Sequence, residues 1–75
     1  MISIFKTNIS SDDLTNVGPH LNGLLTGQIW SIDLWDCDKI LRVDSFININ
    51  EEIKSVLHRL GYICVHLETF YTKPS

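Results

Sequence analysis

Two runs in which every second residue is apolar, 30–35 and 40–43, constrain this chain more than any other feature of its sequence. A period of two places successive side chains on opposite faces of a β-strand. The short polar stretch between the runs therefore predicts a β-hairpin with one apolar face. A two-residue turn at 37–38 would pair Trp35 with Ile40 and would match the facing side chains in character. Because the turn lacks Asn-Gly, a longer loop is an open alternative.

Apolar residues at helical spacing between 14 and 25 predict a helix before the hairpin. Ser10 and Asp13 resemble a capping box at its start, with Asp in place of Glu, and Gly27 suits a glycine at its end. Pro19 falls in the middle of the pattern, where it removes a backbone donor and disfavours helical geometry at the residue before it. We therefore expect either a kink at Pro19 or a short turn followed by a helix that begins near it.

A second helix is predicted after the hairpin, over residues 51–60. Asn50 is the expected N-cap, acidic residues occupy the first turn, where the helix dipole favours them, and Gly61 ends the element. Short apolar segments at 2–6 and 62–68 predict a first and a last strand. The order of elements is therefore strand, helix, strand, strand, helix, strand.

This order predicts the α+β class and a ferredoxin-like βαββαβ fold. Two right-handed crossovers with a hairpin between them give an antiparallel four-stranded sheet of order 4-1-3-2, with two helices on one face. The fold takes residues 1–68, and 69–75 is a C-terminal tail. In this topology the loop at 7–13, the hairpin tip at 36–38 and the turn after the second helix meet at one end.

Composition and charge exclude several classes of function. The 75 residues make one domain, and 44% hydrophobic with 20% charged residues is typical of soluble globular proteins. A formal charge of −3 with six scattered Lys and Arg residues argues against nucleic acid as a partner. No apolar run could cross a bilayer and no signal-peptide pattern opens the chain, so we expect no membrane contact and a cytoplasmic protein. Cys37 and Cys64 lack CxxC spacing and are expected to be free thiols.

Four features together match one known module. They are the apolar helix positions Leu14, Val17 and Leu21, the glycine before the hairpin, the stretch SIDLWDCDKILRVD and the stretch LGYIC. With them, residues 3–66 resemble a heavy-metal-associated domain, the small module of copper chaperones and metal ATPases. The resemblance implies the same ferredoxin-like fold.

The metal-binding loop of that family is different here. The family has Gly-Met-x-Cys-x-x-Cys at the start of its first helix. The apolar positions align Thr7 and Asn8 with the Gly and Met, and Ser10 and Asp13 with the two cysteines. Soft Cu(I) selects thiolates, whereas hydroxyl and carboxylate oxygens are hard ligands. We therefore expect no thiolate copper binding through this loop, and none of the family's functional residues carries over.

A metal site with other ligands is the alternative function. The hairpin tip and the opening loop would form an acidic rim with one thiol, whose candidate ligands are Asp12, Asp13, Asp36, Cys37 and Asp38. Turn and helix-cap positions also explain these residues without a metal. The three histidines do not converge in the predicted fold and no pair of nucleophile and base stands out, so we expect neither an enzyme nor a cofactor.

The sheet face that points away from the helices is predicted to be too apolar for open water. Its candidate interface residues are Ile4, Trp35, Ile40, Ile63, Val65 and Leu67. We therefore expect a small non-enzymatic interaction module whose open face binds a second copy, as a homodimer, or another protein. Two alternatives are open: the last strand faces the other way, or the tail alone covers the patch. Ferredoxin-like dimers can also support a small-molecule sensor, for which the sequence holds no ligand signature.

Overall fold

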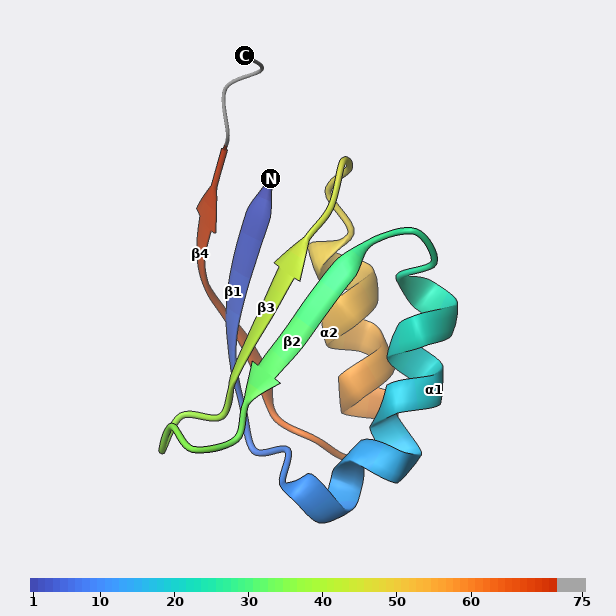
Figure 1. Cartoon of the computed structure of the whole chain (residues 1–75), viewed down its shortest axis with the longest axis vertical. Helices are drawn as coiled ribbons and strands as arrows, with labels where there is room; N and C mark the ends of the chain where they lie inside the picture. The colour runs from blue at the N-terminus through green and yellow to red at the C-terminus, as the bar shows by residue number, and fades with distance from the viewer. Residues whose placement is uncertain (72–75) are drawn as a thin grey trace.

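The computed structural model describes residues 1–71 of the chain (Figure 1). Their elements, in chain order, are β1 Ile2–Thr7, the 3-10 turn η1 Ser11–Asp13, α1 Leu14–Leu24, β2 Ile29–Asp33, β3 Ile40–Asp44, α2 Asn50–Arg59 and β4 Cys64–Phe70. The predicted order of strands and helices is therefore confirmed. Neither helix within residues 1–71 has the length and apolar character needed to cross a membrane.

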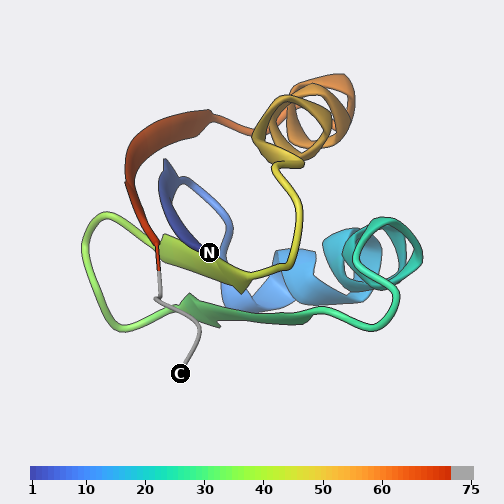
Figure 2. The same ribbon diagram turned by 90° about the horizontal axis from the view of Figure 1, so that it is seen from above.

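The four strands form one antiparallel sheet in the order β2-β3-β1-β4. Read from the β4 edge, this is the order 4-1-3-2. Both helices lie on the same side of the curved sheet, as the view from above shows (Figure 2). The predicted α+β class, with a four-stranded antiparallel sheet and two helices, is confirmed. No helix or strand of residues 1–71 covers the other face of the sheet.

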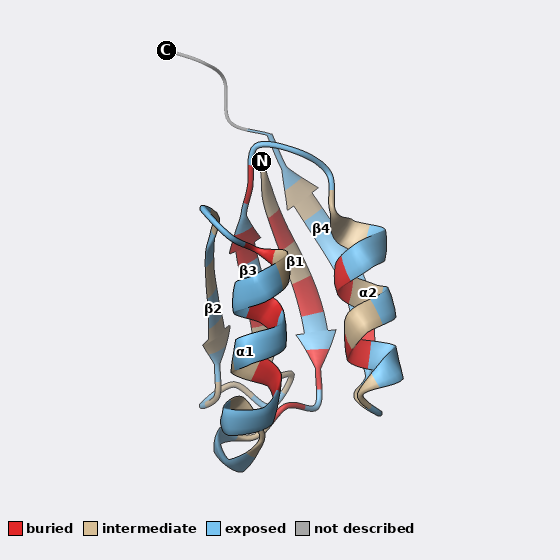
Figure 3. Cartoon of the chain, turned by 90° about the vertical axis from the view of Figure 1, so that its right-hand side faces the viewer, coloured by how far each residue is buried: buried red, intermediate tan, exposed pale blue. Residues whose placement is uncertain are grey.

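The hydrophobic core lies between the sheet and the helices. Figure 3 shows the buried residues as stripes along β1, β3 and the inner sides of α1 and α2. In each helix the buried positions recur four residues apart, at the helical period. The core residues are Phe5, Ile9, Val17, Leu21, Leu25, Leu41, Val43, Ile53, Leu57 and Cys64. Because β4 contributes only Cys64 to this cluster, most of β4 lies at the margin of the fold.

The predicted hairpin forms, but its predicted pairing is wrong. Ile32 lies opposite Leu41 and Asp33 lies opposite Ile40, two residues away from the predicted register. A shift of two residues keeps every side chain on its predicted face, so the match in character along the strands does not distinguish the two registers. The turn is the longer alternative, a loop over 34–39 that contains Trp35.

Side chains of the hairpin loop hold its backbone in place of an Asn-Gly turn. Asp36 Oδ1 accepts the N–H of Asp38 at 2.8 Å, and the Asp36 carbonyl accepts the N–H of Lys39 at 3.1 Å. Lys39 has a φ of 46°, in the left-handed region that non-glycine residues rarely adopt. Its ammonium group donates to the carbonyl of Leu34 at 2.7 Å, across the loop. Local hydrogen bonds therefore stabilise a loop that carries no glycine.

α1 runs from Leu14 to Leu24 through Pro19, so the alternative of a short turn followed by a helix that begins near Pro19 is wrong. The N–H that Pro19 lacks would have bonded the carbonyl of Thr15, and both residues are exposed, so water reaches that carbonyl. Gly18 removes the second obstacle, because the proline ring clashes with the Cβ of the residue before it and glycine has none. The pair of Gly18 and a solvent-facing Pro19 is therefore compatible with a continuous helix.

Gly23→Ala is expected to raise the free energy of unfolding by roughly 0.5–1 kcal/mol. A Cβ at this exposed helical position meets no atom within 4 Å, and Ala restricts the unfolded chain. Gly18→Ala has the same open space around it but places a Cβ beside the Pro19 ring, so it should gain less or lose stability. Chemical denaturation of both variants measures the difference. An equal gain in both would show that Gly18 does not accommodate Pro19.

Asn50 is the first residue of α2 and not its predicted N-cap, a position that Ile49 holds. The side chain of Asn48 accepts the N–H of Asn50 at 3.1 Å. The Asn50 side chain is thereby free to point toward β4, where it donates to Thr69 Oγ1 at 3.4 Å. The Asn50 side chain therefore contacts β4 and does not cap α2.

The end of α2 follows the prediction. Gly61 has a φ of 92°, which glycine adopts without the steric cost that other residues meet. The N–H of Gly61 bonds the carbonyl of His58 at 3.0 Å, and the N–H of Tyr62 bonds the carbonyl of Leu57 at 2.9 Å. These are the two hydrogen bonds of a Schellman motif, which satisfies carbonyls at the end of a helix.

β4 continues to Phe70, two residues into the segment that was predicted to be a tail, and residues 72–75 of that segment lie outside the described residues. The strand contains a bulge: Phe5 of β1 lies opposite His66, but Ile4 lies opposite Glu68. Leu67 is therefore an extra residue on β4.

The bulge resets the alternation of side chains along β4. Cys64 is buried, so the side chains of Val65 and Leu67 point away from the helices. Beyond the bulge, Glu68 and Phe70 pair with outward-pointing residues of β1 and lie on the same side. Four residues of the last strand therefore share the outer side, and the alternative in which this strand faces the other way is excluded.

Candidate functional site

The opening loop, the hairpin loop and the turn after α2 meet at one end of the fold, as the topology predicted. Thr7 Oγ1 donates to the carbonyl of Lys39, in the hairpin loop, at 2.6 Å. Asn8 Oδ1 accepts the N–H of Ile63, between α2 and β4, at 2.9 Å. The two residues that align with the family's Gly and Met thus hold neighbouring loops in place.

Asp13, which aligns with the second cysteine of the family's metal loop, has a structural role. Its Oδ2 accepts the N–H and the hydroxyl of Ser10 at 2.9 and 2.8 Å, and its Oδ1 accepts the hydroxyl of Tyr62 at 3.0 Å. The hydrogen bonds from Ser10 first, and then that from Tyr62, hold the pKa of Asp13 below its ordinary value. The stability from this group is present above the unfolded-state pKa of about 3.9 and is lost as the pH falls through the lower folded-state pKa.

The structure brings three of the five candidate metal ligands together. Among residues 1–71, one group of possible ligands has its atoms all within 4.8 Å of one another, and it consists of Asp36, Cys37 and Asp38. Asp12 and Asp13 of the opening loop are not part of that group. The chemistry available at the hairpin tip is therefore two carboxylates and one thiol, all from a single loop.

The two cysteines differ in exposure and in acidity. Cys37 is exposed in the hairpin loop, and Cys64 is buried at the start of β4. Desolvation raises the pKa of the Cys64 thiol to about 11. Because a raised pKa favours the neutral thiol, the stability from Cys64 is full below the unfolded-state pKa of about 8.5 and is lost as the pH rises toward 11.

At pH 8 Cys37 is expected to react with a disulfide reagent at least about tenfold faster than Cys64, because the thiolate is the reactive form and only Cys37 is accessible. Absorbance during the reaction should show one fast and one slow thiol in the native protein. In denaturant both should react quickly. A fast thiol that persists in native Cys37→Ser would contradict the burial of Cys64.

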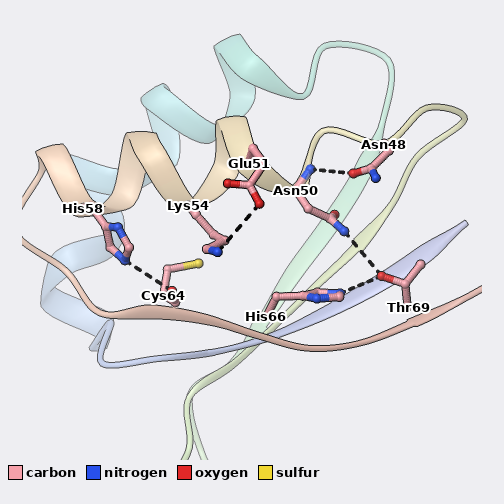
Figure 4. Close-up of polar contacts among 8 residues, drawn as sticks. All are labelled: Asn48, Asn50, Glu51, Lys54, His58, Cys64, His66 and Thr69. Carbon is pink, nitrogen blue, oxygen red and sulfur yellow. Dashed lines mark hydrogen bonds and ion pairs between the residues drawn. The ribbon is translucent and has the colours of Figure 1, made fainter.

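A polar network links α2 to the inner side of β4 (Figure 4). Thr69 Oγ1 lies at its centre, 3.4 Å from Asn50 Nδ2 and 2.6 Å from His66 Nε2. Farther along, His58 Nε2 lies 3.2 Å from the carbonyl oxygen of Cys64, and the figure shows these contacts as a separate group. No buried side-chain polar atom among the described residues lacks a hydrogen-bond partner. The network therefore attaches the helix to the strand.

The outer face is the sheet surface opposite the helices, and the strand registers order its residues into rows. The first row, from β2 to β4, holds Ile29, Asp44, Ile2 and Phe70, and the second holds Ser31, Arg42, Ile4 and Glu68. In the third, Asp33 lies opposite Ile40 and Lys6 lies opposite Val65. Apolar side chains are concentrated on β1 and β4, whereas most charges lie on β2 and β3.

Four of the six predicted interface residues share this outer face. Ile4 and Ile40 are half-buried, while Val65 and Leu67 are 48% and 51% exposed. Phe70, which the sequence assigned to the tail, is 49% exposed and extends the apolar surface along β4. The tail residues up to Phe70 therefore widen the patch instead of covering it.

The other two predicted interface residues lie elsewhere. Trp35 is 99% exposed in the hairpin loop, where it lines a shallow hollow with Ser10 and Ser11 of the opening loop. Ile63 precedes β4 and lies beside Asn8. Trp35 was expected on the face opposite Ile40, but Asp33 holds that place and Trp35 lies in the loop. Ile63 was expected there from the alternation along the last strand, which begins only at Cys64.

Sequence reasoning missed an exposed apolar pair at the opposite end of the fold. Phe46 is 90% exposed and Ile47 is also exposed, in the loop between β3 and α2. The N–H of Phe46 donates to the side chain of Gln28, which places the pair near the exposed Ile29 at the start of β2. The sequence signal that could have revealed this pair is two adjacent apolar residues, Phe46 and Ile47, within an otherwise polar loop.

Scans against protein-family models, curated proteins and solved structures found no match for this chain. A function for the protein therefore rests on the chemistry of its own surfaces. Of these, the outer face carries the exposed Val65, Leu67 and Phe70, and no helix or strand of residues 1–71 lies over it.

Proposed function

We propose that this chain is a small non-enzymatic interaction module that binds a protein through the outer face of its sheet. The scaffold is ferredoxin-like and resembles heavy-metal-associated domains, without their thiolate copper binding. The carrying observation is an apolar strip along the last strand and its neighbour, formed by Ile2, Ile4, Val65, Leu67 and Phe70. A contiguous apolar patch of this kind on a small domain usually marks an interface.

The energetics of a short chain support the proposal. A domain of 75 residues buries a small core, so the cover of a partner adds stability that the chain alone lacks. Covering a half-exposed Leu67 or Phe70 side chain contributes on the order of 1 kcal/mol. Such a gain at several positions of the apolar strip favours a protein partner over open water.

The polar groups support a binding role and not a catalytic one. The Asp13 carboxylate is occupied by Ser10 and Tyr62, and the histidines of the α2 and β4 network have backbone or side-chain partners. No pair of nucleophile and base with an adjacent apolar cavity emerges from these contacts.

A photo-crosslinking amino acid at Leu67 tests the proposal in the cells that produce the protein. Leu67 lies on the apolar strip, whereas Asn16 lies on the exposed side of α1 and provides the matched control. We expect a discrete covalent adduct from position 67 and none from position 16. An adduct of twice the chain mass indicates self-association, and a discrete adduct of another mass indicates a different protein.

The absence of any discrete adduct from position 67, or equal adducts from both positions, would reject the interaction module. A third substitution, at Val65, shows whether a missing adduct at position 67 results from a disturbed fold. The same amino acid at Val65 points to the same side as Leu67 and should reproduce its adduct.

Metal handling at the hairpin tip is the second candidate, favoured by the grouping of Asp36, Cys37 and Asp38 within 4.8 Å. Thiolate with carboxylate ligands would suit zinc better than magnesium or calcium. Calorimetric titration with zinc and with Cu(I) tests this function. Tight stoichiometric binding that Cys37→Ser abolishes would support it, and binding that is absent or unchanged in Cys37→Ser would reject it.

A further inference from the structure

We propose that the partner at the outer face is a second copy of this chain, in a two-fold dimer whose axis runs along β1. The inference rests on the proposed function, that the outer face binds a protein. The observation that supports it is the second row of that face, where Arg42 and Glu68 lie on either side of Ile4.

The two charges are placed symmetrically about β1. Arg42 of β3 lies directly opposite Ile4, and Glu68 of β4 lies directly opposite Ile4 on its other side. Neighbouring strands are about 4.8 Å apart, so each charge is one strand from the central isoleucine. Both side chains are exposed, and within residues 1–71 neither forms an ion pair.

A two-fold axis parallel to β1 brings the positive charge of one copy opposite the negative charge of the other. It lays β3 of one copy over β4 of the other, so Arg42 faces Glu68 of the partner subunit and Glu68 faces Arg42 of the partner subunit. A two-fold contact is isologous, so the charge pair forms twice. Between the two pairs, Ile4 packs against Ile4 of the partner subunit.

One flanking row places Asp44 of β3 over Phe70 of the partner subunit, a contact without charge complementarity, and the other row is more favourable. Ile40 of β3 comes to lie over Val65 of the partner subunit, an apolar contact. Lys6 lies near the axis, and Asp38 of its own chain offsets its charge at 3.5 Å. Two sheets that stack face to face lie about 10 Å apart with their strands within about 30° of one another, which this arrangement allows.

The charges exclude the other simple way of stacking two copies. An axis perpendicular to the strands would set Arg42 against Arg42 of the partner subunit and Glu68 against Glu68 of the partner subunit. Like charges that face each other oppose association. Of these two axes through the row, the charges of Arg42 and Glu68 therefore favour the one along β1.

Charge reversal of Arg42 and Glu68 tests the dimer by sedimentation equilibrium. The wild-type chain should show a monomer to dimer equilibrium that weakens as salt is added. Arg42→Glu alone and Glu68→Arg alone each turn two attractive pairs into two repulsive pairs, so each should raise the Kd at least about tenfold at low salt.

An equimolar mixture of the two single variants, compared with each single variant and with wild type, completes the test. In the mixed dimer the new Glu at 42 faces the new Arg at 68, and the native Arg42 faces the native Glu68. The mixture should therefore associate about as tightly as wild type, and so should the double reversal in one chain. A geometry that set 42 against 42 and 68 against 68 would leave each single variant as weak as wild type and would make the mixture tighter than wild type. Weakened single variants together with a mixture that only matches wild type therefore identify the contact of 42 with 68.

Arg59→Glu and Glu52→Arg are the matched controls, since both residues are exposed on α2, away from the outer face. They should leave the Kd unchanged, and circular dichroism should show that every variant is folded. A wild-type chain that stays monomeric at millimolar concentration would overturn the dimer, as would a mixture no tighter than the single variants. Crosslinking to a different protein together with a monomeric purified chain would reject the dimer and retain the interaction module.

Discussion

Leu57→Ala is expected to lower the free energy of unfolding by about 3 kcal/mol, within a range of about 2–5 kcal/mol for buried Leu to Ala changes. Leu57 is fully buried on the inner side of α2, where its removal leaves a cavity under Ile53 and the sheet. A chain of this length commonly has roughly 4–11 kcal/mol of stability in total. The variant should therefore retain only roughly 1–8 kcal/mol and should unfold at a clearly lower denaturant concentration than wild type.

Val56→Ala provides the matched comparison, because Val56 is adjacent in sequence but only half-buried. It should cost less than about 1 kcal/mol. Urea denaturation with linear extrapolation measures both variants, at one fixed protein concentration because association would add to apparent stability. A loss below about 1 kcal/mol for Leu57→Ala would contradict its place at the centre of the core.

Thr7→Val is expected to lower the free energy of unfolding by about 1–3 kcal/mol, the usual cost of leaving buried polar groups without partners. The buried Thr7 hydroxyl donates to the Lys39 carbonyl at 2.6 Å and accepts the N–H of Ile9 at 3.3 Å. Val has nearly the same shape but can do neither. The hairpin loop would lose its hydrogen bond to the opening loop.

Thr7→Ser keeps the hydroxyl and should recover most of that loss. Thr26→Val removes an exposed hydroxyl that donates to the carbonyls of Asn22 and Gly23, and it should change stability by less than about 0.5 kcal/mol. The same denaturation experiment compares the three variants. Equal losses of stability in Thr7→Val and Thr26→Val would show that the contact with Lys39 stabilises the fold no more than an exposed hydrogen bond does.

The hairpin shows where sequence reasoning succeeds and where it stops. Alternation predicted the strands and the side that each residue faces, because these depend only on the period of the strand. It did not predict the register, because Ile32 meets an inward-facing residue whether it lies opposite Leu41 or Val43. The register depends on contacts such as that of Thr7 with Lys39, which comes from a strand far away in the sequence.

The helices show the same division between local and long-range causes. Apolar spacing predicted both helices and Gly61 predicted the end of the second. Asn50 was expected to cap α2, but its side chain contacts Thr69 of β4. The helix does not restart at Pro19 because Gly18 and solvent exposure together accommodate the proline, a combination that the general rule for proline does not include.

The candidate site could be predicted only in part for a related reason. The outward positions of Val65 and Leu67 follow from alternation, and the structure places both on the outer face. The positions of Glu68 and Phe70 depend on the bulge, which simple alternation does not reveal. The relation between Arg42 and Glu68 requires the registers of two strand pairs at once, so it could not emerge before the sheet was assembled.

The bulge at Leu67 also bears on how this protein avoids aggregation. β4 is an edge strand, and a flat edge with free backbone groups can recruit further strands without limit. The extra residue bends the edge and disrupts its hydrogen-bond spacing, so another strand cannot pair evenly along its whole length. In the proposed dimer the two-fold contact is closed, and an irregular β4 edge would oppose the addition of further strands along that edge.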